Sequence, residues 1–189
     1  MNVDILKLGF LATNCSIVYD ENGDAAVIDP AEHADTILAH LKKKDLTCRS
    51  ILITHGHPDH TGALAGLKSA TGAEVCVGEG DAYRLPIAAD RLLLDGDAVQ
   101  VGRLHFSVIA TPGHTEGGVC YLLEDILFAG DTLFYESVGR TDFPGGSTAV
   151  LMQSLKKLKE LPYDDLQVIP GHEELTTLAH ERAHNPYLR

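Results

Sequence analysis

The sequence contains no apolar run approaching the roughly 20 residues that a transmembrane helix needs. Its first residues carry an early Asp4 and lack both a basic segment and a small-residue cleavage site, so we expect no secretory signal peptide. The cysteines form no C-x-x-C pair, and this spacing favours free thiols in a reducing compartment. The four residues concerned are Cys15, Cys48, Cys76 and Cys120. These absences predict a cytoplasmic protein that is not attached to a membrane.

Long basic blocks and an excess of positive charge are also missing. The chain has 15 lysines and arginines against 27 aspartates and glutamates, which gives a formal net charge of -12. Such a surface repels phosphate backbones, so we expect no nucleic-acid partner. The sequence shows no long linker and no fixed-period repeat, and 44% of its 189 residues are hydrophobic. We therefore expect one packed domain spanning residues 1–189.

Short apolar segments separated by turn residues predict a series of strands, and leucines or isoleucines at helical spacing predict the helices between them. The expected strands are 3–8, 14–19, 25–28, 49–54, 74–77, 91–94, 98–101, 104–110, 119–123, 126–129 and 166–169. The expected helices lie near 37–44, 61–70, 147–161 and 177–184. This order predicts an α/β fold in which two mainly antiparallel sheets pack together with helices outside, a four-layer α/β/β/α sandwich.

A dense cluster of metal-ligand side chains follows the strand expected at 49–54. His55, His57, Asp59 and His60 fall within six residues. Histidine and aspartate together suit zinc, iron or manganese, and a strand end that leads into a helix is a rigid mount for ligands. The alternation of His55 and His57 points two rings the same way, whereas Asp59 and His60 project elsewhere. The cluster therefore indicates a second cation rather than one crowded site.

Three later residues repeat this placement, because each follows an expected strand and has glycine beside it. Glycine lets the backbone turn sharply and approach a site closely. The three are His114, Asp131 and His172. Asp29 and Glu173 are candidates for orienting ligand histidines from outside. His180 and His184, four residues apart on the last expected helix, are a weaker candidate pair for a separate cation.

The H-x-H-x-D-H motif and the spaced His, Asp and His that follow resemble those of the metallo-β-lactamase fold superfamily over nearly the whole chain. The resemblance implies the α/β/β/α sandwich and two divalent cations per chain. It implies that the first cation is bound by His55, His57 and His114. The second would be bound by Asp59, His60 and His172, with Asp131 bridging the two.

Within the superfamily the sequence most resembles the glyoxalase II branch, the hydroxyacylglutathione hydrolases, in their short bacterial form. Segments 130–134, 138–146 and 181–188 carry this resemblance. It implies a thioesterase whose substrate is a small thioester, possibly derived from glutathione. The nucleophile would be a hydroxide between two cations, of which zinc is the first choice, and Asp59 and Asp131 would have catalytic roles. Arg140 stands where the family carries a basic residue that meets the glutathione carboxylate; an ion pair with an internal aspartate is the other interpretation.

Two departures and several alternatives stay open. The long family form has a C-terminal helical domain that binds glutathione, which we do not expect here, and an aromatic residue where this chain has Glu174. Persulfide dioxygenases resemble the chain at 139–143 and bind one iron with a set equivalent to His55, His114 and Asp131. A non-catalytic metal-binding protein, a β-lactamase or lactonase, and a nuclease are the further alternatives. The filled ligand positions argue against a non-catalytic protein. The missing secretion signal argues against a β-lactamase or lactonase, and the short, acidic chain argues against a nuclease.

Overall fold

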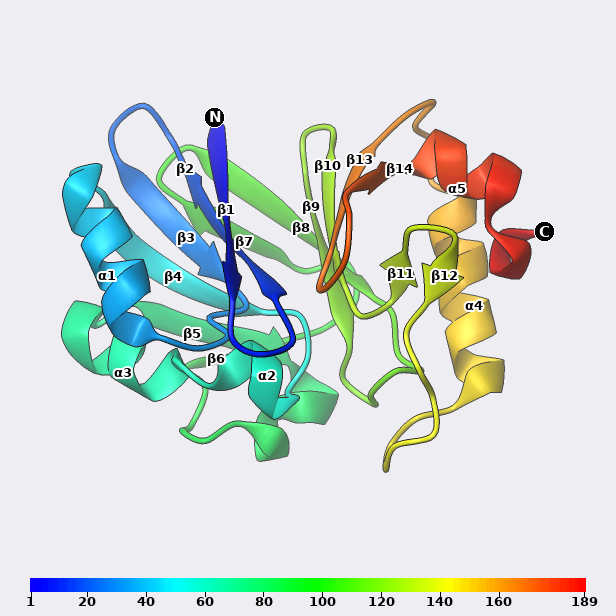
Figure 1. The fold of residues 1–189 in the computed structure, drawn as a ribbon, viewed down its shortest axis with the longest axis horizontal. Helices are drawn as coiled ribbons and strands as arrows, with labels where there is room; N and C mark the ends of the chain where they lie inside the picture. The colour runs from blue at the N-terminus through cyan, green and yellow to red at the C-terminus, as the bar shows by residue number, and fades with distance from the viewer.

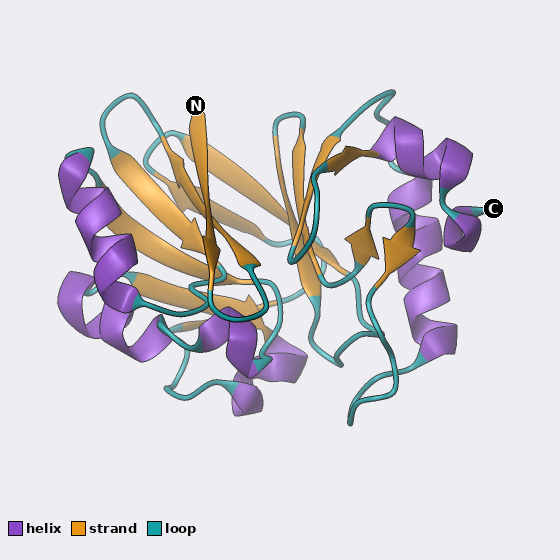
Figure 2. Cartoon of the chain, viewed as in Figure 1, coloured by secondary structure: helices purple, strands orange, loops and turns teal.

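The computed structural model describes residues 1–189, which form two six-stranded sheets packed between two layers of helices (Figure 1, Figure 2). The first sheet has the order β1 (Asn2–Leu8), β2 (Thr13–Tyr19), β3 (Asp24–Ile28), β4 (Thr47–Ile53), β5 (Glu74–Gly78) and β6 (Arg91–Leu93). The second has the order β14 (Thr176–Thr177), β13 (Gln167–Pro170), β10 (Ile126–Gly130), β9 (Val119–Leu123), β8 (Leu104–Ala110) and β7 (Ala98–Val101).

The helices cover the outer faces of the two sheets. On the first sheet lie α1 (Ala34–Lys43) and α3 (Leu64–Thr71), and on the second α4 (Thr148–Lys159) and α5 (Leu178–His184), as Figure 1 shows. The remaining elements are short: α2 (Pro58–Thr61), the 3-10 helices η1 (Glu79–Arg84) and η2 (Pro186–Leu188), and the hairpin of β11 (Leu133–Phe134) and β12 (Ser137–Val138). This arrangement confirms the predicted four-layer sandwich.

Three apolar clusters fill the three interfaces between the four layers. Because side chains alternate along a strand, Ile51 and Ile53 of β4 pack under α1 and α3, whereas Leu52 faces the second sheet. Along β9, Tyr121 faces the first sheet, while the side chain of Leu122 joins the cluster beneath α4. Strands buried on both faces read as continuous apolar runs, which is why β4 and β9 stood out in the sequence.

The prediction of mainly antiparallel sheets is wrong for the first sheet. β1, β2 and β3 are antiparallel neighbours, but β3, β4, β5 and β6 pair in parallel. The chain passes through α1 between β3 and β4, and through α2 and α3 between β4 and β5. Such helical crossovers return the next strand in the same direction, so they impose parallel pairing. In the second sheet β10 and β13 are also parallel.

The longer helices confirm the sequence patterns, with one difference. The helix expected over 61–70 divides into α2 and α3, and α3 ends at Gly72 with φ 69°, as a glycine stop requires. α4 begins where expected, since the Ser147 side chain accepts a hydrogen bond from the Val150 amide at 3.4 Å. No periodic pattern marks η1, η2, β11, β12 or β14 in the sequence, because each element is too short. None of the helices combines the length and apolar character needed to cross a bilayer.

Candidate metal centre

Seven side chains of metal-ligand type meet at the edge of the sandwich where strands from both sheets end. His55 and His57 follow β4, and Asp59 and His60 lie in α2. His114 follows β8, Asp131 follows β10, and His172 follows β13. Ligands expected from four separate loops are therefore brought together, although they span more than half of the sequence.

The first group consists of His55, His57 and His114. One ligand atom from each lies within 4.8 Å of the others. His114 Nε2 is 2.9 Å from His57 Nδ1, and His55 Nε2 is buried without any hydrogen-bond partner. A buried ring nitrogen without a partner is costly unless something absent from the chain binds it.

The second group consists of Asp59, His60 and His172, whose ligand atoms again lie within 4.8 Å of one another. His172 Nε2 is 3.1 Å from Asp59 Oδ2 and 3.2 Å from His60 Nε2. Asp59 is the more exposed of the two carboxylates in the centre, with 27% of its side chain accessible against 11% for Asp131. Asp59 is thus the carboxylate that solvent or a ligand can reach.

Asp131 lies between the two groups. Its Oδ1 is 3.3 Å from His60 Nε2, and its Oδ2 is 3.5 Å from His114 Nε2. Oδ1 is buried and accepts no hydrogen bond. An added Cβ at Gly171 would lie 2.2 Å from this oxygen, so position 171, which lies against Asp131, tolerates only glycine.

The outward ring nitrogens of the ligand histidines have partners elsewhere in the chain. His60 Nδ1 is 2.9 Å from Asp29 Oδ2, as expected for an orienting carboxylate. His114 Nδ1 donates to the Arg140 carbonyl at 2.7 Å, and His172 Nδ1 to the Leu11 carbonyl at 3.1 Å. In the neutral form of each ring these contacts place the proton on Nδ1, so the lone pair of Nε2 faces the centre.

Glu173 does not act as predicted through its carboxylate. Its backbone is left-handed, with φ 68°, and its carbonyl accepts hydrogen bonds from Lys7 Nζ at 3.3 Å and Asn14 Nδ2 at 3.4 Å. No hydrogen bond joins its side chain to a ligand histidine. The residue instead fixes the loop that carries His172.

The environment of the centre favours the side-chain charge states that bind cations, which are neutral imidazole for His55 and ionised carboxylate for Asp59 and Asp131. Burial and the neighbouring imidazole His60 hold the pKa of His55 well below its usual value, so the ring stays neutral. Burial works against ionisation of Asp59, but the hydrogen bond from His172 lowers the pKa of Asp59 to about 2. Burial likewise opposes ionisation of Asp131, which the charge of His60 outweighs, so the pKa of Asp131 is also lowered.

His60 and His172 behave in the opposite way. Burial opposes protonation of His60, but the carboxylates of Asp131 and Asp29 outweigh it and raise the pKa of His60 well above its usual value. The Asp59 carboxylate raises the pKa of His172 against the effect of burial. In the absence of a cation these rings hold protons, which a bound cation would displace.

The donor set fits divalent transition metals. Neutral imidazoles and ionised carboxylates are ligands of zinc, iron and manganese, and lone pairs from three residues converge in each group. The unpartnered His55 Nε2 and Asp131 Oδ1 are the atoms that such cations would satisfy. His55, His57 and His114 would hold one cation, and Asp59, His60 and His172 the other, with Asp131 in reach of both.

A cleft of about 720 Å³ opens onto the centre. Its apolar wall includes Leu11, Phe134 and Phe143, and its cations are Lys7 and Arg140. The Arg140 guanidinium donates to both oxygens of Asp142, at 2.6 and 2.7 Å, and lies 3.8 Å above the Phe143 ring. Arg140 therefore lines the cleft and makes the ion pair with an aspartate that was its other interpretation, and its contact with a substrate carboxylate stays a prediction.

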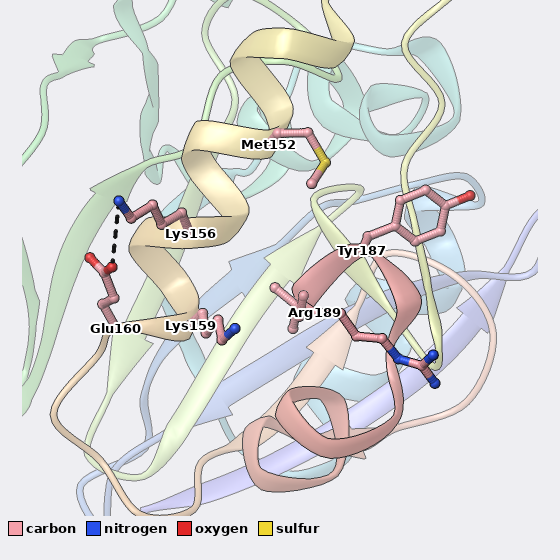
Figure 3. A pocket seen from close by; sticks show the side chains of 7 residues that line it. Met152, Lys156, Lys159, Glu160, Tyr187 and Arg189 are labelled. Atoms are coloured by element: carbon pink, nitrogen blue, oxygen red, sulfur yellow. Dashed lines mark ion pairs between the residues drawn. The ribbon is translucent and has the colours of Figure 1, made fainter.

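Other candidate features lie apart from the centre. His180 contacts Glu136 at 3.0 Å and its ring is 4.6 Å from that of His184, but the two histidines form no three-residue ligand group. A second cleft, of about 480 Å³, lies between α4 and η2 (Figure 3). Its lining includes the ion pair of Lys156 with Glu160, and none of the seven candidate ligands borders it.

Asp81 is a residue that sequence analysis missed. It is wholly buried, and it accepts hydrogen bonds from the amides of Gly56 and Gly117, which lie in two ligand-bearing loops. A single aspartate in a short turn carries no periodic or motif signal, so nothing in the sequence separated it from the surface aspartates.

Known proteins resemble this chain in sequence. The family described as the metallo-beta-lactamase superfamily matches residues 8–172. Hydroxyacylglutathione hydrolase GloC of Haemophilus influenzae is 34% identical over 209 residues, covering 100% of this chain and 98% of the relative. A hydroxyacylglutathione hydrolase of Rhodospirillum rubrum is 44% identical over 153 residues, which cover 80% of this chain and 58% of that protein.

Solved structures resemble the chain in fold. The B3 metallo-beta-lactamase BLEG-1 has a TM-score of 0.93 at 33% identity, covering 99% of each chain. ETHE1 from Myxococcus xanthus has a TM-score of 0.91 at 36% identity, covering 98% of this chain and 84% of that one. A protein in a di-iron-bound form has a TM-score of 0.88 at 34% identity, covering 98% of this chain and 100% of that one. Because proteins with different names share the fold, the fold alone does not decide the reaction.

Proposed function

The chain belongs to the metallo-β-lactamase superfamily, and from this premise we propose that it is a two-metal thioesterase of the hydroxyacylglutathione hydrolase type. The observation that carries the proposal is the pair of three-residue ligand groups with Asp131 between them. The hydroxyacylglutathione hydrolases at 34% and 44% identity support the substrate class.

Divalent cations held by these groups would lower the pKa of water toward about 7 and polarise a substrate carbonyl. The ionised Asp59 faces the cleft and accepts a hydrogen bond from attacking water, which orients it toward the carbonyl. A thiolate leaves readily, so no strong general acid is required of the chain. The cysteines are all buried, which leaves water as the nucleophile in this proposal.

The cleft suits a small thioester with a negative charge. Arg140 and Lys7 supply positive charge at the wall, and Phe134 and Phe143 offer apolar contact for the rest of the substrate. Arg140 meets a substrate carboxylate by exchanging or sharing the Asp142 carboxylate. Glutathione-derived thioesters carry such carboxylates. We also propose a cytoplasmic location, which the free thiols of the four cysteines support.

Zinc is the first choice for both cations, with iron and manganese as alternatives. Sites of histidine and aspartate accept all three, and metal availability in the cell decides among them. The similarity to a di-iron-bound structure supports including iron. Elemental analysis of protein purified without added metal gives the metal type and the ratio per chain.

Hydrolysis of S-lactoylglutathione before and after treatment with a chelator tests the proposed reaction. We expect cleavage in the untreated protein, its loss after chelation, and its return when zinc is added back. An untreated sample that contains two metal ions per chain and still cleaves no thioester at high enzyme concentration contradicts the thioesterase proposal.

A second candidate function is oxidation of a persulfide by a mononuclear iron protein. Two histidines and one carboxylate suffice for non-haem iron. His55, His114 and Asp131 provide such a set, with His114 Nε2 3.5 Å from Asp131 Oδ2. Oxygen uptake in the presence of glutathione persulfide separates the candidates, because hydrolysis of a thioester consumes no oxygen.

A further inference from the structure

Asp81 is a buried carboxylate that the proposed chemistry does not use. It lies in η1, between β5 and β6, and its two oxygens reach two loops of the metal centre. Oδ2 accepts a hydrogen bond from the Gly56 amide at 2.8 Å, and Oδ1 accepts one from the Gly117 amide at 2.9 Å. Gly56 stands between His55 and His57, while Gly117 follows His114 by three residues. One side chain thus joins the loops that carry the whole first ligand group.

The loops also pack against η1 without room for a side chain. An added Cβ at Gly56 would lie 2.6 Å from Arg84 Cβ, and one at Gly117 would lie 2.1 Å from the Asp81 amide nitrogen. At Gly145, in the loop after Arg140, it would lie 2.4 Å from Arg84 Nη2. Gly56 and Gly117 therefore rest directly on this short helix, and Gly145 lies against the end of the Arg84 side chain.

Arg84 completes this contact. Its side chain is 15% exposed, its Nε lies 3.4 Å from Asp81 Oδ1, and its Nη2 donates to the Pro144 carbonyl at 2.8 Å. The guanidinium offsets the buried charge of Asp81, which would be costly if left unpaired. Through the Pro144 carbonyl it also fixes the loop that begins at Arg140, and the Arg140 carbonyl accepts the hydrogen bond from His114 Nδ1.

The second ligand group is supported from elsewhere. His60 is held by Asp29, and His172 by the carbonyl of Leu11. Neither partner contacts Asp81 or Arg84. Asp29 also accepts hydrogen bonds from the amide and the hydroxyl of Thr54, which precedes His55, so its support extends to both groups. The contacts of Asp81 and Arg84, in contrast, are confined to the loops of the first group and the loop after Arg140.

We propose that Asp81 is a positioning residue for the first cation: with Arg84 it fixes the His55–His57 loop against the His114 loop and sets the affinity of that group alone. The inference rests on the proposed metal centre and not on the identity of the substrate. Outer partners of metal ligands typically change metal affinity by about 10–100-fold when removed.

The test is a zinc titration of Asp81→Asn against a competing chelator. Asparagine keeps one acceptor but turns an NH2 group toward the other glycine amide, so one of the two hydrogen bonds is lost. We expect two zinc ions to bind the wild-type chain. In the variant, the affinity for one zinc should fall by about 10–100-fold, with the other unchanged.

Asp20→Asn is the matched control. Asp20 is also buried and accepts hydrogen bonds from the amides of Asn22, Asp24 and Arg103, but it lies in turns remote from the centre. This control should lower the melting temperature without changing either zinc affinity. If Asp81→Asn binds both ions like the wild type, or weakens both equally, the proposed role is wrong.

A second variant covers the case in which Asp81→Asn does not fold. Arg84→Gln leaves both glycine hydrogen bonds in place and removes the charge beside Asp81, and we expect a smaller loss confined to the same zinc. Wild-type affinities in Arg84→Gln would overturn the proposal. Thioester cleavage by the wild-type chain is a separate readout. If the variants show the selective zinc loss but the wild-type chain with both zinc ions bound cleaves no thioester, this inference stands and the proposed function is contradicted.

Discussion

The tautomers of three candidate ligand histidines are decided by atoms outside the metal centre. The proton on Nδ1 is fixed by the Asp29 carboxylate in His60, by the Arg140 carbonyl in His114 and by the Leu11 carbonyl in His172. The sequence named Asp29 as a candidate, because carboxylates commonly orient ligand histidines. It could not point to the two carbonyls, since every residue has one and only the fold decides which is near a ring.

Asp131→Asn tests the residue that lies between the two groups. The amide cannot supply a second anionic oxygen, so we expect weaker binding of both cations. Activity should fall by more than the roughly 100-fold that loss of an outer partner can cause. Metal per chain and S-lactoylglutathione turnover measure both effects. Asp45→Asn, at an exposed left-handed position that asparagine tolerates, is the control and should leave both unchanged.

Arg140→Gln tests substrate recognition. If Arg140 meets a substrate carboxylate, KM for an anionic thioester should rise roughly tenfold, as for loss of a charged hydrogen bond, with kcat little changed. Arg91→Gln is the control, because Arg91 is a partly exposed arginine whose side chain donates to the Ala98 backbone carbonyl. A KM equal to that of the wild type would mean that Arg140 serves only its ion pair with Asp142.

The pH dependence of this contact follows from the Asp142 carboxyl. The hydrogen bonds from Arg140 lower the pKa of Asp142 to about 2. A lowered carboxyl pKa means that the pair is present above the ordinary pKa and is lost only as the pH falls toward 2. Titration of Asp142 should therefore add no pH dependence to KM between about pH 5 and 9.

At the scale of elements, the ligands depend on loops that leave the strands in unusual backbone conformations. Gly113, next to His114, has φ 133°, and an added Cβ would lie 2.3 Å from the amide nitrogen of Leu151 in α4. The first turn of α4 is also tied to this loop, because the Ser147 amide donates to the Gly113 carbonyl at 2.8 Å. The helix thus supports the His114 loop as well as covering the sheet.

Gly113→Ala should therefore lower the free energy of unfolding by more than the penalty of its backbone conformation alone. At Gly96, with φ 83° and nothing within 4 Å of an added Cβ, alanine carries only the left-handed penalty of roughly 1–2 kcal/mol. Gly113→Ala adds a clash with α4, so its free energy of unfolding in urea should fall further, by roughly 1–3 kcal/mol more. If the free energy of unfolding falls equally in the two variants, α4 shifts to admit the added methyl group without an energetic penalty.

At the scale of the whole molecule, the metal centre joins the two sheets. His55 and His57 follow a strand of the first sheet, whereas His114, Asp131 and His172 follow strands of the second. Each ligand group takes residues from both halves of the sandwich. Bound cations should therefore stabilise the packing of one sheet on the other, in addition to the apolar cluster between them.

Metal removal should accordingly lower the melting temperature. A ligand present at 1,000 times its Kd stabilises the folded state by about 4 kcal/mol, and a chain of this size shifts by roughly 2–4 °C for each kcal/mol. We expect chelation to lower the melting temperature by about 8–16 °C in scanning calorimetry. The same chelator saturated beforehand with zinc is the control. An unchanged melting temperature after verified metal loss would exclude a role for cations in joining the sheets.

The sequence by itself determined the strands and helices whose apolar periodicity is long enough to read, and it named the ligand types at the ends of strands. The motif 55–60 is local, so its chemistry was visible before folding. The tertiary structure decided what depends on contact between distant segments: parallel pairing around α1 and α3, the carbonyls behind the histidines, and the burial of Asp81 against Gly56 and Gly117. Such contacts leave no periodic trace, because they join single atoms that the chain brings together only when both sheets are packed.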